Sequence, residues 1–293
     1  MLLCPASLAE ELPEPIRPEP VPFDASVSYP TLPWDALLSP IEPHQDGFLP
    51  DEMGYHDDSL DIRITTFRRH DTTVMAVYVT LRDVSQFRTG TSAGRPPWDT
   101  TSTVPQMAKR YHAVLAINGD YFGYHNEGIV CRNGTVLRCR PMSYRDELLV
   151  HRNGDLSVLL SPTQEDWDAV APDVLHSFCF GPALVVDGAL NEQACDTIMD
   201  LGKSKPTQRM AIGQIGPLQY LFVATEGPEN PGSVGFTLEQ LAQLMLDMGC
   251  SVAYNLDGGS SSTVVLNYQK INALSTGKCR PVSDCIWFAT LVP

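Results

Sequence analysis

The sequence predicts an α+β fold, in which a mixed and largely antiparallel sheet is accompanied by few helices. Three observations lead to this prediction. Short apolar runs rich in β-branched residues recur throughout residues 58–293, turn dipeptides separate several of them, and only two segments have helical periodicity. Strands that greatly outnumber helices are typical of α+β domains. We therefore expect one domain, preceded by an N-terminal extension.

The expected strands are apolar runs of four to nine residues, many of them β-branched. Such runs are short enough for strands and too short for most helices. They lie at 60–67, 73–81, 112–118, 183–186, 209–215, 218–225, 252–256, 262–267 and 285–291.

Three hairpins are expected because Asn-Gly or Asp-Gly lies between neighbouring apolar runs. These dipeptides adopt the positive φ angles that tight hairpin turns require. The turns are Asn133-Gly134, Asn153-Gly154 and Asp187-Gly188, within hairpins 128–139, 146–160 and 183–191.

Helical periodicity is clearest at 238–248, where Leu and Met recur every three to four residues. Thr237 and Gln240 form a capping-box pair at its start, and Gly249 is a typical stop. A second helix is expected at 103–111.

The N-terminal segment differs from the rest of the chain in charge and proline content. The whole chain has 20 basic and 35 acidic residues, a net charge of −15; residues 1–58 hold 12 of the acids and only one base, Arg17. Eleven of the 24 prolines fall in the first 50 residues. Such a segment cannot bury enough apolar surface to fold alone. We expect 1–57 to be an acidic spacer or an arm on the body, and 58–293 to be the catalytic-size domain.

Part of this arm carries apolar side chains that would dock on the body. They are Leu32, Trp34, Leu37, Leu38, Ile41 and Phe48. The first nine residues are either the end of a signal peptide, since Ser7-Leu8-Ala9 is small-x-small, or an ordinary start of a cytoplasmic protein.

Composition excludes several classes of protein. An acidic chain without a basic stretch argues against a nucleic-acid partner. No apolar run reaches 18 residues, so we expect no integral membrane segment. The eight cysteines include no C-x-x-C pair and no zinc-type cluster with histidine. Their even number permits disulfides, and Cys131/Cys139 and Cys279/Cys285 are close pairs, so the cysteines leave the redox compartment open.

The segment 253–263 (AYNLDGGSSST) is the strongest candidate for chemistry. Asn255 and Asp257 alternate in strand phase, so both side chains leave the same face. The next residues, Gly258, Gly259, Ser260 and Ser261, combine a backbone turn with hydroxyl donors, which suits an anion or a sugar beside a carboxylate. The alternative is a Gly-rich turn capped by Asp and Ser.

A second candidate is the segment 116–123 (AINGDYFG), in which Asn118, Gly119, Asp120 and Tyr121 follow an apolar run. An aromatic ring beside a carboxylate and an amide suits a sugar site. The alternative is a turn whose aromatic residues belong to the core.

Two arginines stand at the beginnings of strands, Arg209 and Arg280. The guanidinium fork fits phosphate oxygens in a bidentate manner, although a solvated surface position is the simpler interpretation of each. Gly-x-Ser-x-Gly is absent, which argues against a serine hydrolase.

Together these segments resemble the phosphodiester glycosidase family over about residues 110–291. The resemblance rests on 117–122, 180–184 with Asp187-Gly188, 209–213, the helix at 236–249, 255–263 and 280–284. The chain departs from the family pattern at Met210, at Pro228 after Glu226-Gly227, and at Ser260, where a third glycine is common.

The resemblance implies hydrolysis of the anomeric C–O bond of a sugar-1-phosphodiester similar to an N-acetylglucosamine-1-phosphodiester. It implies Asp257 as the catalytic carboxylate, with Asp120 and then Glu226 as further candidates. Arg209, Arg280 and the 258–262 backbone would hold the phosphate charge. It also implies an extracellular or cell-surface location, on an envelope glycan or exopolysaccharide.

Two other functions use the same residues. A non-catalytic module would bind an envelope glycan in the same pocket without releasing product. Alternatively Asp257, Asp120 and Asn255 would bind a Ca²⁺ or Mg²⁺ ion, because hard cations prefer oxygen ligands. The expectation from the resemblance is a hydrolase that needs no cofactor.

Overall fold

A computed structural model describes residues 17–36, 38–92, 100–192 and 205–293. The prediction about residues 1–9 falls outside these ranges. Within them, every paired strand is antiparallel and three α-helices are present, which confirms the α+β class. No helix in the described ranges is long and apolar enough to cross a bilayer.

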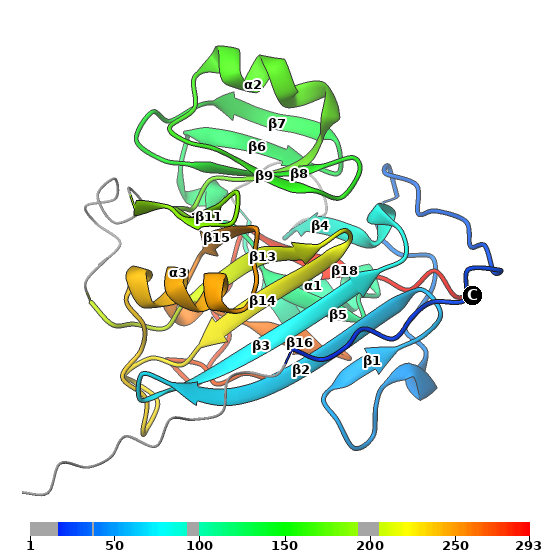
Figure 1. Ribbon diagram of the computed structural model, residues 1–293. Coiled ribbons are helices and arrows are strands. Elements are labelled where there is room, and N and C mark those ends of the chain that lie inside the picture. The colour runs from blue at the N-terminus through cyan, green and yellow to red at the C-terminus, as the bar shows by residue number, and fades with distance from the viewer. Residues whose placement is uncertain (1–16, 37, 93–99, 193–204) are drawn as a thin grey trace, which may run out of the picture.

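The largest sheet has eight strands and forms one layer of the molecule (Figure 1). In spatial order these are β1 (Gly54–His56), β2 (Leu60–Arg69), β3 (Thr72–Leu81), β14 (Gln219–Thr225), β13 (Met210–Gly216), β15 (Val252–Leu256), β11 (Ala183–Val186) and β12 (Ala189–Leu190).

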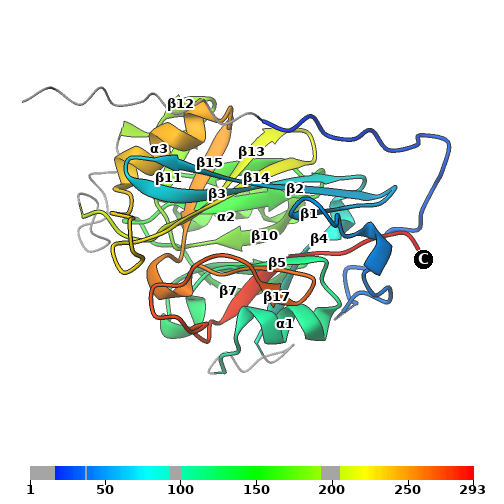
Figure 2. The same cartoon turned by 90° about the horizontal axis from the view of Figure 1, so that it is seen from below.

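A five-stranded sheet packs against it as a second layer (Figure 2). Its order is β17 (Gln269–Lys270), β16 (Val264–Leu266), β5 (Leu115–Asn118), β18 (Asp284–Phe288) and β4 (Phe87–Thr91).

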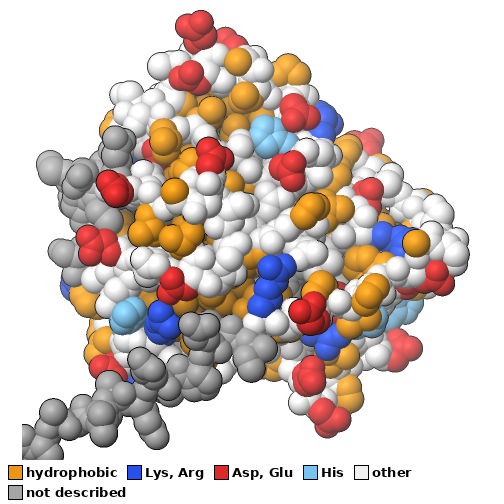
Figure 3. Space-filling view, in the orientation of Figure 1, with side chains coloured by type: hydrophobic (Ala, Val, Ile, Leu, Met, Phe, Trp, Pro, Cys, Tyr) orange, Lys and Arg blue, Asp and Glu red, His pale blue; other side chains and the backbone are white. Residues whose placement is uncertain are grey.

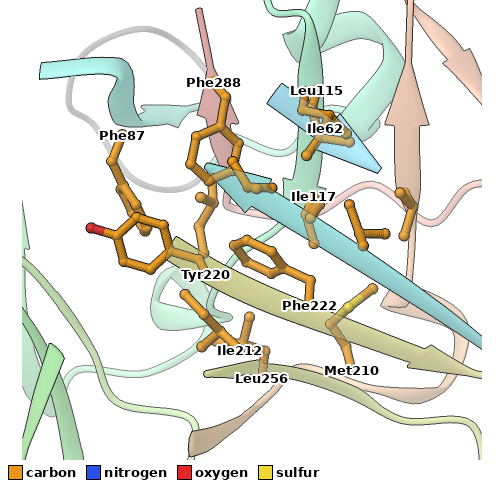
Figure 4. Close-up of a cluster of buried hydrophobic side chains, with 14 of the residues drawn as sticks. Ile62, Phe87, Leu115, Ile117, Met210, Ile212, Tyr220, Phe222, Leu256 and Phe288 are labelled. Carbon is orange, nitrogen blue, oxygen red and sulfur yellow. The ribbon is translucent and has the colours of Figure 1, made fainter. Parts of the chain in front are cut away.

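The core between the two sheets follows from strand alternation. Along β13, Met210 and Ile212 face the second sheet, whereas Ala211 faces the opposite side. Figure 4 shows this core, with Phe222 of the first sheet near Phe288 of the second, their ring centroids 5.8 Å apart.

Helices cover the two outer faces. α3 (Leu238–Asp247) lies on the eight-stranded sheet, and α1 (Val104–Tyr111) lies on the five-stranded one. Both helices were expected. The Thr237 hydroxyl accepts a hydrogen bond from the Gln240 N–H at 3.2 Å, and Gly249 has φ +84°, so the predicted capping box and stop are confirmed.

A smaller lobe is inserted between β5 and β11, at the top of Figure 1. It contains the hairpin β6 (Gly128–Arg132) and β7 (Thr135–Arg140) and the sheet β10 (Val174–Phe178), β8 (Glu147–His151) and β9 (Leu156–Leu159). All three predicted hairpins are present: β6–β7, β8–β9 and β11–β12. α2 (Gln164–Val170) also packs on this lobe and was not expected.

The described part of the N-terminal segment lies on the body. Leu32 is buried and Phe48 packs against Tyr55, with ring centroids 4.9 Å apart. The Arg88 guanidinium lies 5.0 Å from the centroid of the Trp34 ring, which covers it, whereas Leu38 is exposed and Leu37 falls outside the described ranges.

Acidic side chains are scattered over the face in Figure 3 rather than gathered in one patch.

Candidate active site

Three of the predicted residues lie at the same end of the eight-stranded sheet. β14 and β15 end there and β13 begins there, because β13 runs antiparallel to both neighbours. Glu226 follows β14, Arg209 precedes β13 and Asp257 follows β15. Antiparallel pairing therefore explains why residues far apart in the sequence converge.

The second sheet contacts this end of the first sheet through Asn118, the last residue of β5. Its Nδ2 donates to the Asp257 carbonyl at 2.8 Å, and its Oδ1 accepts from the Thr263 N–H at 2.9 Å. Asn118 is completely buried, so the loop from Asp257 to Thr263 is fixed at both ends by one side chain.

The glycines of this loop allow it to approach β13 closely. The Gly259 N–H donates to the Gln208 carbonyl at 2.8 Å, with a Gly259 φ of +56°. A Cβ on Gly258 would lie 2.9 Å from the same carbonyl oxygen. The turn continues through a short 3-10 helix at Gly259–Ser261.

Asp257 is the partly exposed carboxyl of this arrangement. Burial raises its pKa to about 6, while a hydrogen bond from the Ser261 side chain and the positive charge of Arg280 act in the opposite direction. Arg280 is exposed, and its Nη1 lies 3.5 Å from Ser261 Oγ. The carboxyl is thus poised to titrate near neutral pH beside a cation, which is typical of catalytic groups.

Asp120 is close enough for its charge to raise the pKa of Asp257, but it is buried. Its Oδ1 accepts from the Tyr121 N–H and its Oδ2 from the Cys179 N–H, both at 2.7 Å. With both oxygens bonded to the backbone, Asp120 fixes the loop that carries Tyr121.

Arg132 and Asp284 form a buried ion pair behind Asp120, which the sequence did not reveal. Arg132 Nε and Nη2 each lie 2.8 Å from Asp284 Oδ2, and Asp284 Oδ1 accepts from the Asp120 N–H at 2.8 Å. A Cβ on Gly119 would lie 2.6 Å from the Asp284 carboxylate, so this position requires glycine. The charge of Arg132 thereby balances the negative charge of Asp284 and of the nearby Asp120.

Two aromatic side chains, Tyr121 and Phe180, pack against each other next to Asp120 in this site. The Tyr121 ring lies 4.8 Å from that of Phe180, and the Arg145 guanidinium lies 5.4 Å from the Tyr121 ring centroid. Burial raises the pKa of Tyr121 to about 12. Sequence reasoning identified Tyr121 but missed Arg145, which lies outside every segment singled out for chemistry.

Arg209 is placed differently from the expected phosphate ligand. It is only 4% exposed; Nε donates to the Phe236 carbonyl at 3.0 Å and Nη2 to the Lys205 carbonyl at 3.3 Å. Its strand phase matches Ala211, which faces α3. Burial lowers its pKa to about 10. These bonds hold the entry to β13 in place.

Glu226 lines a cavity of about 200 Å³ together with Thr73, Met75 and Asn272. It accepts a hydrogen bond from Ser233 Oγ at 2.5 Å. Asn272 connects this cavity to the Asp257 loop, since its Nδ2 donates to the Ser262 carbonyl at 3.0 Å.

Asn255 Nδ2 donates to the Gly181 carbonyl at 2.7 Å. Its Oδ1, and the hydroxyls of Ser262 and Thr263, are buried and have no hydrogen-bond partner among the described residues. An unpaired buried polar group costs about 1–3 kcal/mol. These three groups lie within six residues of Asp257, and ordered water is the usual partner of buried polar groups of this kind.

Within the described ranges, no group of three or more His, Cys, Asp or Glu side chains could hold a metal ion. The six cysteines in those ranges are free thiols. They include the close pairs Cys131/Cys139 and Cys279/Cys285.

The chain is similar to known proteins in sequence and in fold. A family model described as phosphodiester glycosidase matches residues 111–289. A curated relative, the SPbeta prophage-derived uncharacterized protein YomE of Bacillus subtilis (strain 168), is 28% identical over 189 residues. That match covers 63% of this chain but only 29% of the relative's length.

Solved structures share the fold. The zebrafish N-acetylglucosamine-1-phosphodiester alpha-N-acetylglucosaminidase catalytic domain, auto-inhibited by its pro-peptide, matches with TM-score 0.66 and 19% identity, over 80% of this chain and 85% of that one. A hypothetical protein from Synechocystis matches with TM-score 0.55 and 15% identity, over 78% of this chain and 62% of that one.

Proposed function

Because the chain belongs to the phosphodiester glycosidase family, we propose that it hydrolyses the anomeric C–O bond of a sugar-1-phosphodiester, with an N-acetylglucosamine-1-phosphodiester as the model substrate. One observation carries the proposal. Asp257, a partly exposed carboxyl with a pKa near 6, lies beside Arg280 and the Gly258–Ser261 turn, where both sheets meet.

The chemistry requires a carboxylate more than a strong acid. A phosphate monoester is a weak base, so it departs from the anomeric carbon with little protonation. The sugar then develops positive charge, which a nearby carboxylate stabilises or captures. In this proposal Asp257 performs that role in its ionised form, above pH 6.

The departing phosphate needs donors and positive charge. Arg280, the Ser261 hydroxyl and the backbone of the 258–262 turn are suited to it, because Ser261 hydrogen-bonds to the Asp257 carboxyl, the charge of Arg280 acts on that carboxyl, and the turn directly follows Asp257. Asp120 and Arg209 keep the supporting loops in place, since their polar atoms bond to the backbone. Glu226, in its neighbouring cavity, remains a candidate second carboxylate.

We also propose that the substrate belongs to an envelope or extracellular glycan, as the family resemblance implies. Fractionation of the native host cells, followed by immunodetection, tests this location. Recovery only in the cytosolic fraction would contradict it.

Hydrolysis in H₂¹⁸O tests the reaction itself. The substrate is the methyl phosphodiester of N-acetylglucosamine-1-phosphate, and the products are analysed by mass spectrometry. Cleavage at the anomeric C–O bond puts the label in the sugar and leaves methyl phosphate unlabelled. Label in the phosphate would indicate P–O cleavage, and saturable binding without product would favour the non-catalytic module.

A further inference from the structure

A second cavity lies in the inserted lobe, between the β6–β7 hairpin and the loop that follows Tyr121. It has a volume of about 370 Å³, and its walls include Phe122, Asn126, Val130, Arg138 and Arg140. None of the residues discussed above for bond cleavage lines it, so the cavity is separate from the groups that would cleave the bond.

One side of the Arg138 guanidinium has no hydrogen-bond partner in the described part of the chain. Its Nη1 donates to the carbonyls of Phe122, at 3.0 Å, and His125, which holds the guanidinium in one orientation. Nε and Nη2 are buried and have no hydrogen-bond partner among the described residues. These two groups form the side of the guanidinium that binds a carboxylate or phosphate with two parallel hydrogen bonds.

Burial without a partner is costly for such a group, since each unpaired donor loses its bonds to water. An oxyanion seated against Arg138 would pair both donors and balance the charge. In the described part of the chain, neither Glu127 nor Glu147 pairs these two donors: Glu127 accepts from the Tyr144 hydroxyl, and Glu147 accepts from the Ile129 N–H.

Local charge favours an anion as well. Residues 128–145 contain four arginines and no acid, in a chain with net charge −15. Of the flanking acids, Asp146 and Glu147 accept hydrogen bonds from the N–H groups of Ala183 and Ile129. Arg140 is exposed, and its Nη1 donates to the Asn126 carbonyl at 3.1 Å, so a second guanidinium stands at the same cavity.

The cavity adjoins the candidate active site. Phe122 follows Asp120 by two residues, and its ring lies 5.0 Å from the Arg132 guanidinium. His125 lies near both places: burial lowers its pKa, the charges of Arg145 and Arg138 lower it further, and the charge of Asp120 raises it. Its ring centroid is 4.1 Å from that of Tyr121.

We propose that this cavity is an anion subsite that binds a second phosphate or carboxylate group on the substrate glycan, with Arg138 and Arg140 as its ligands. The inference rests on the proposed function and narrows it to polyanionic glycans. Arg138 supplies the bidentate contact, and Arg140 attracts the chain from solvent.

A binding experiment tests the subsite without depending on catalysis. Inorganic phosphate is titrated by calorimetry into the full-length protein and into Arg138→Gln, Arg140→Gln and Arg280→Gln variants. We expect Arg138→Gln to remove one class of phosphate sites that Arg280→Gln retains, and Arg140→Gln to weaken it several-fold. Unchanged binding in both subsite variants would refute the subsite, whatever the activity.

A kinetic experiment tests its connection to the substrate. Two substrates are compared: the methyl phosphodiester of N-acetylglucosamine-1-phosphate, and a dimer of such units that carries a second phosphodiester. A third substrate, in which a uronic acid replaces the second phosphodiester, tests whether the subsite also binds a carboxylate. Arg138→Gln should raise KM about tenfold for the dianionic substrate relative to the simple one. An equal change for both substrates would overturn the assignment to the glycan.

Arg138 also holds two loop carbonyls, so thermal unfolding is measured for each variant. Arg138→Lys keeps the charge but loses the bidentate edge, and should lie between the wild type and Arg138→Gln. If Arg138→Gln does not fold, Arg138→Lys and Arg140→Gln decide the question by the same two readouts.

Discussion

The Asn118 amide donates to the main-chain carbonyl of Asp257 at 2.8 Å, across 139 positions of sequence. This contact joins the end of β5 to the end of β15, and thus one sheet to the other. The position of the candidate catalytic carboxyl therefore depends on a residue in the opposite layer of the sandwich.

Replacing Asn118 by Ala should impair both stability and activity. It leaves the Asp257 carbonyl and the buried Thr263 N–H without their partner, and an unpaired buried group costs about 1–3 kcal/mol. Urea unfolding and kcat are the measurements, and we expect at least a tenfold loss of kcat. Asn153→Ala, on an exposed hairpin, is the control; equal behaviour of the two variants would contradict the role of Asn118.

Replacing Arg132 by Met should destabilise the protein strongly. It removes the counter-charge of the buried Asp284 and of the nearby Asp120. Breaking a buried ion pair from one side costs about 3–5 kcal/mol. The control is Glu52→Gln, which disrupts an exposed ion pair with Arg63 and should cost less than about 1 kcal/mol. A loss below that value for Arg132→Met, from chemical unfolding, would show that this pair is dispensable.

The position of the acid limb of the pH–rate profile should depend on Arg280. Ionised Asp257 is the reactive form, so kcat/KM should rise with pH and level off above about pH 6. The positive charge of Arg280 lowers the pKa of Asp257, and Arg280→Gln should therefore move this limb to higher pH. Lys109→Gln removes a charge from α1 and should leave the limb in place; a common shift in both variants would argue against a local effect.

The ionised carboxyl should also reduce stability. Because burial raises the folded-state pKa of Asp257 above 3.8, its stabilising contribution is complete below the unfolded pKa and is lost as pH rises to about 6. Asp257→Asn should therefore be more stable than the wild type at pH 8, with a smaller difference at pH 4. Thermal unfolding at the two pH values measures this. A variant less stable at pH 8 would contradict burial as the cause.

Local patterns in the sequence predicted much of the fold. The Thr237–Gln240 capping box and the Asn133-Gly134 turn depend on neighbouring residues only, so their signals are complete in the sequence. β4 was missed because Arg88 and Gly90 interrupt its apolar pattern. Arg88 is tolerated because Trp34 and Trp287 cover it, a contact that no local window contains.

The site was predicted less completely for a similar reason. The motifs pointed to Asp257, whose two-residue spacing from Asn255 is visible in the sequence, and to Asn118, which ends an apolar run. The direction of Arg209 depends on α3 and on the carbonyl of Phe236, and the pairing of Arg132 with Asp284 joins two sheets. Long-range partners determine these side chains, and a single sequence does not display them.

The most direct test of the account is the activity of Asp257→Asn on the methyl phosphodiester of N-acetylglucosamine-1-phosphate at pH 7, with circular dichroism and thermal unfolding as checks of the fold. We expect a folded variant whose release of N-acetylglucosamine falls by at least a thousandfold. A folded variant that turns over at a rate near that of the wild type would show that the reacting carboxylate lies elsewhere.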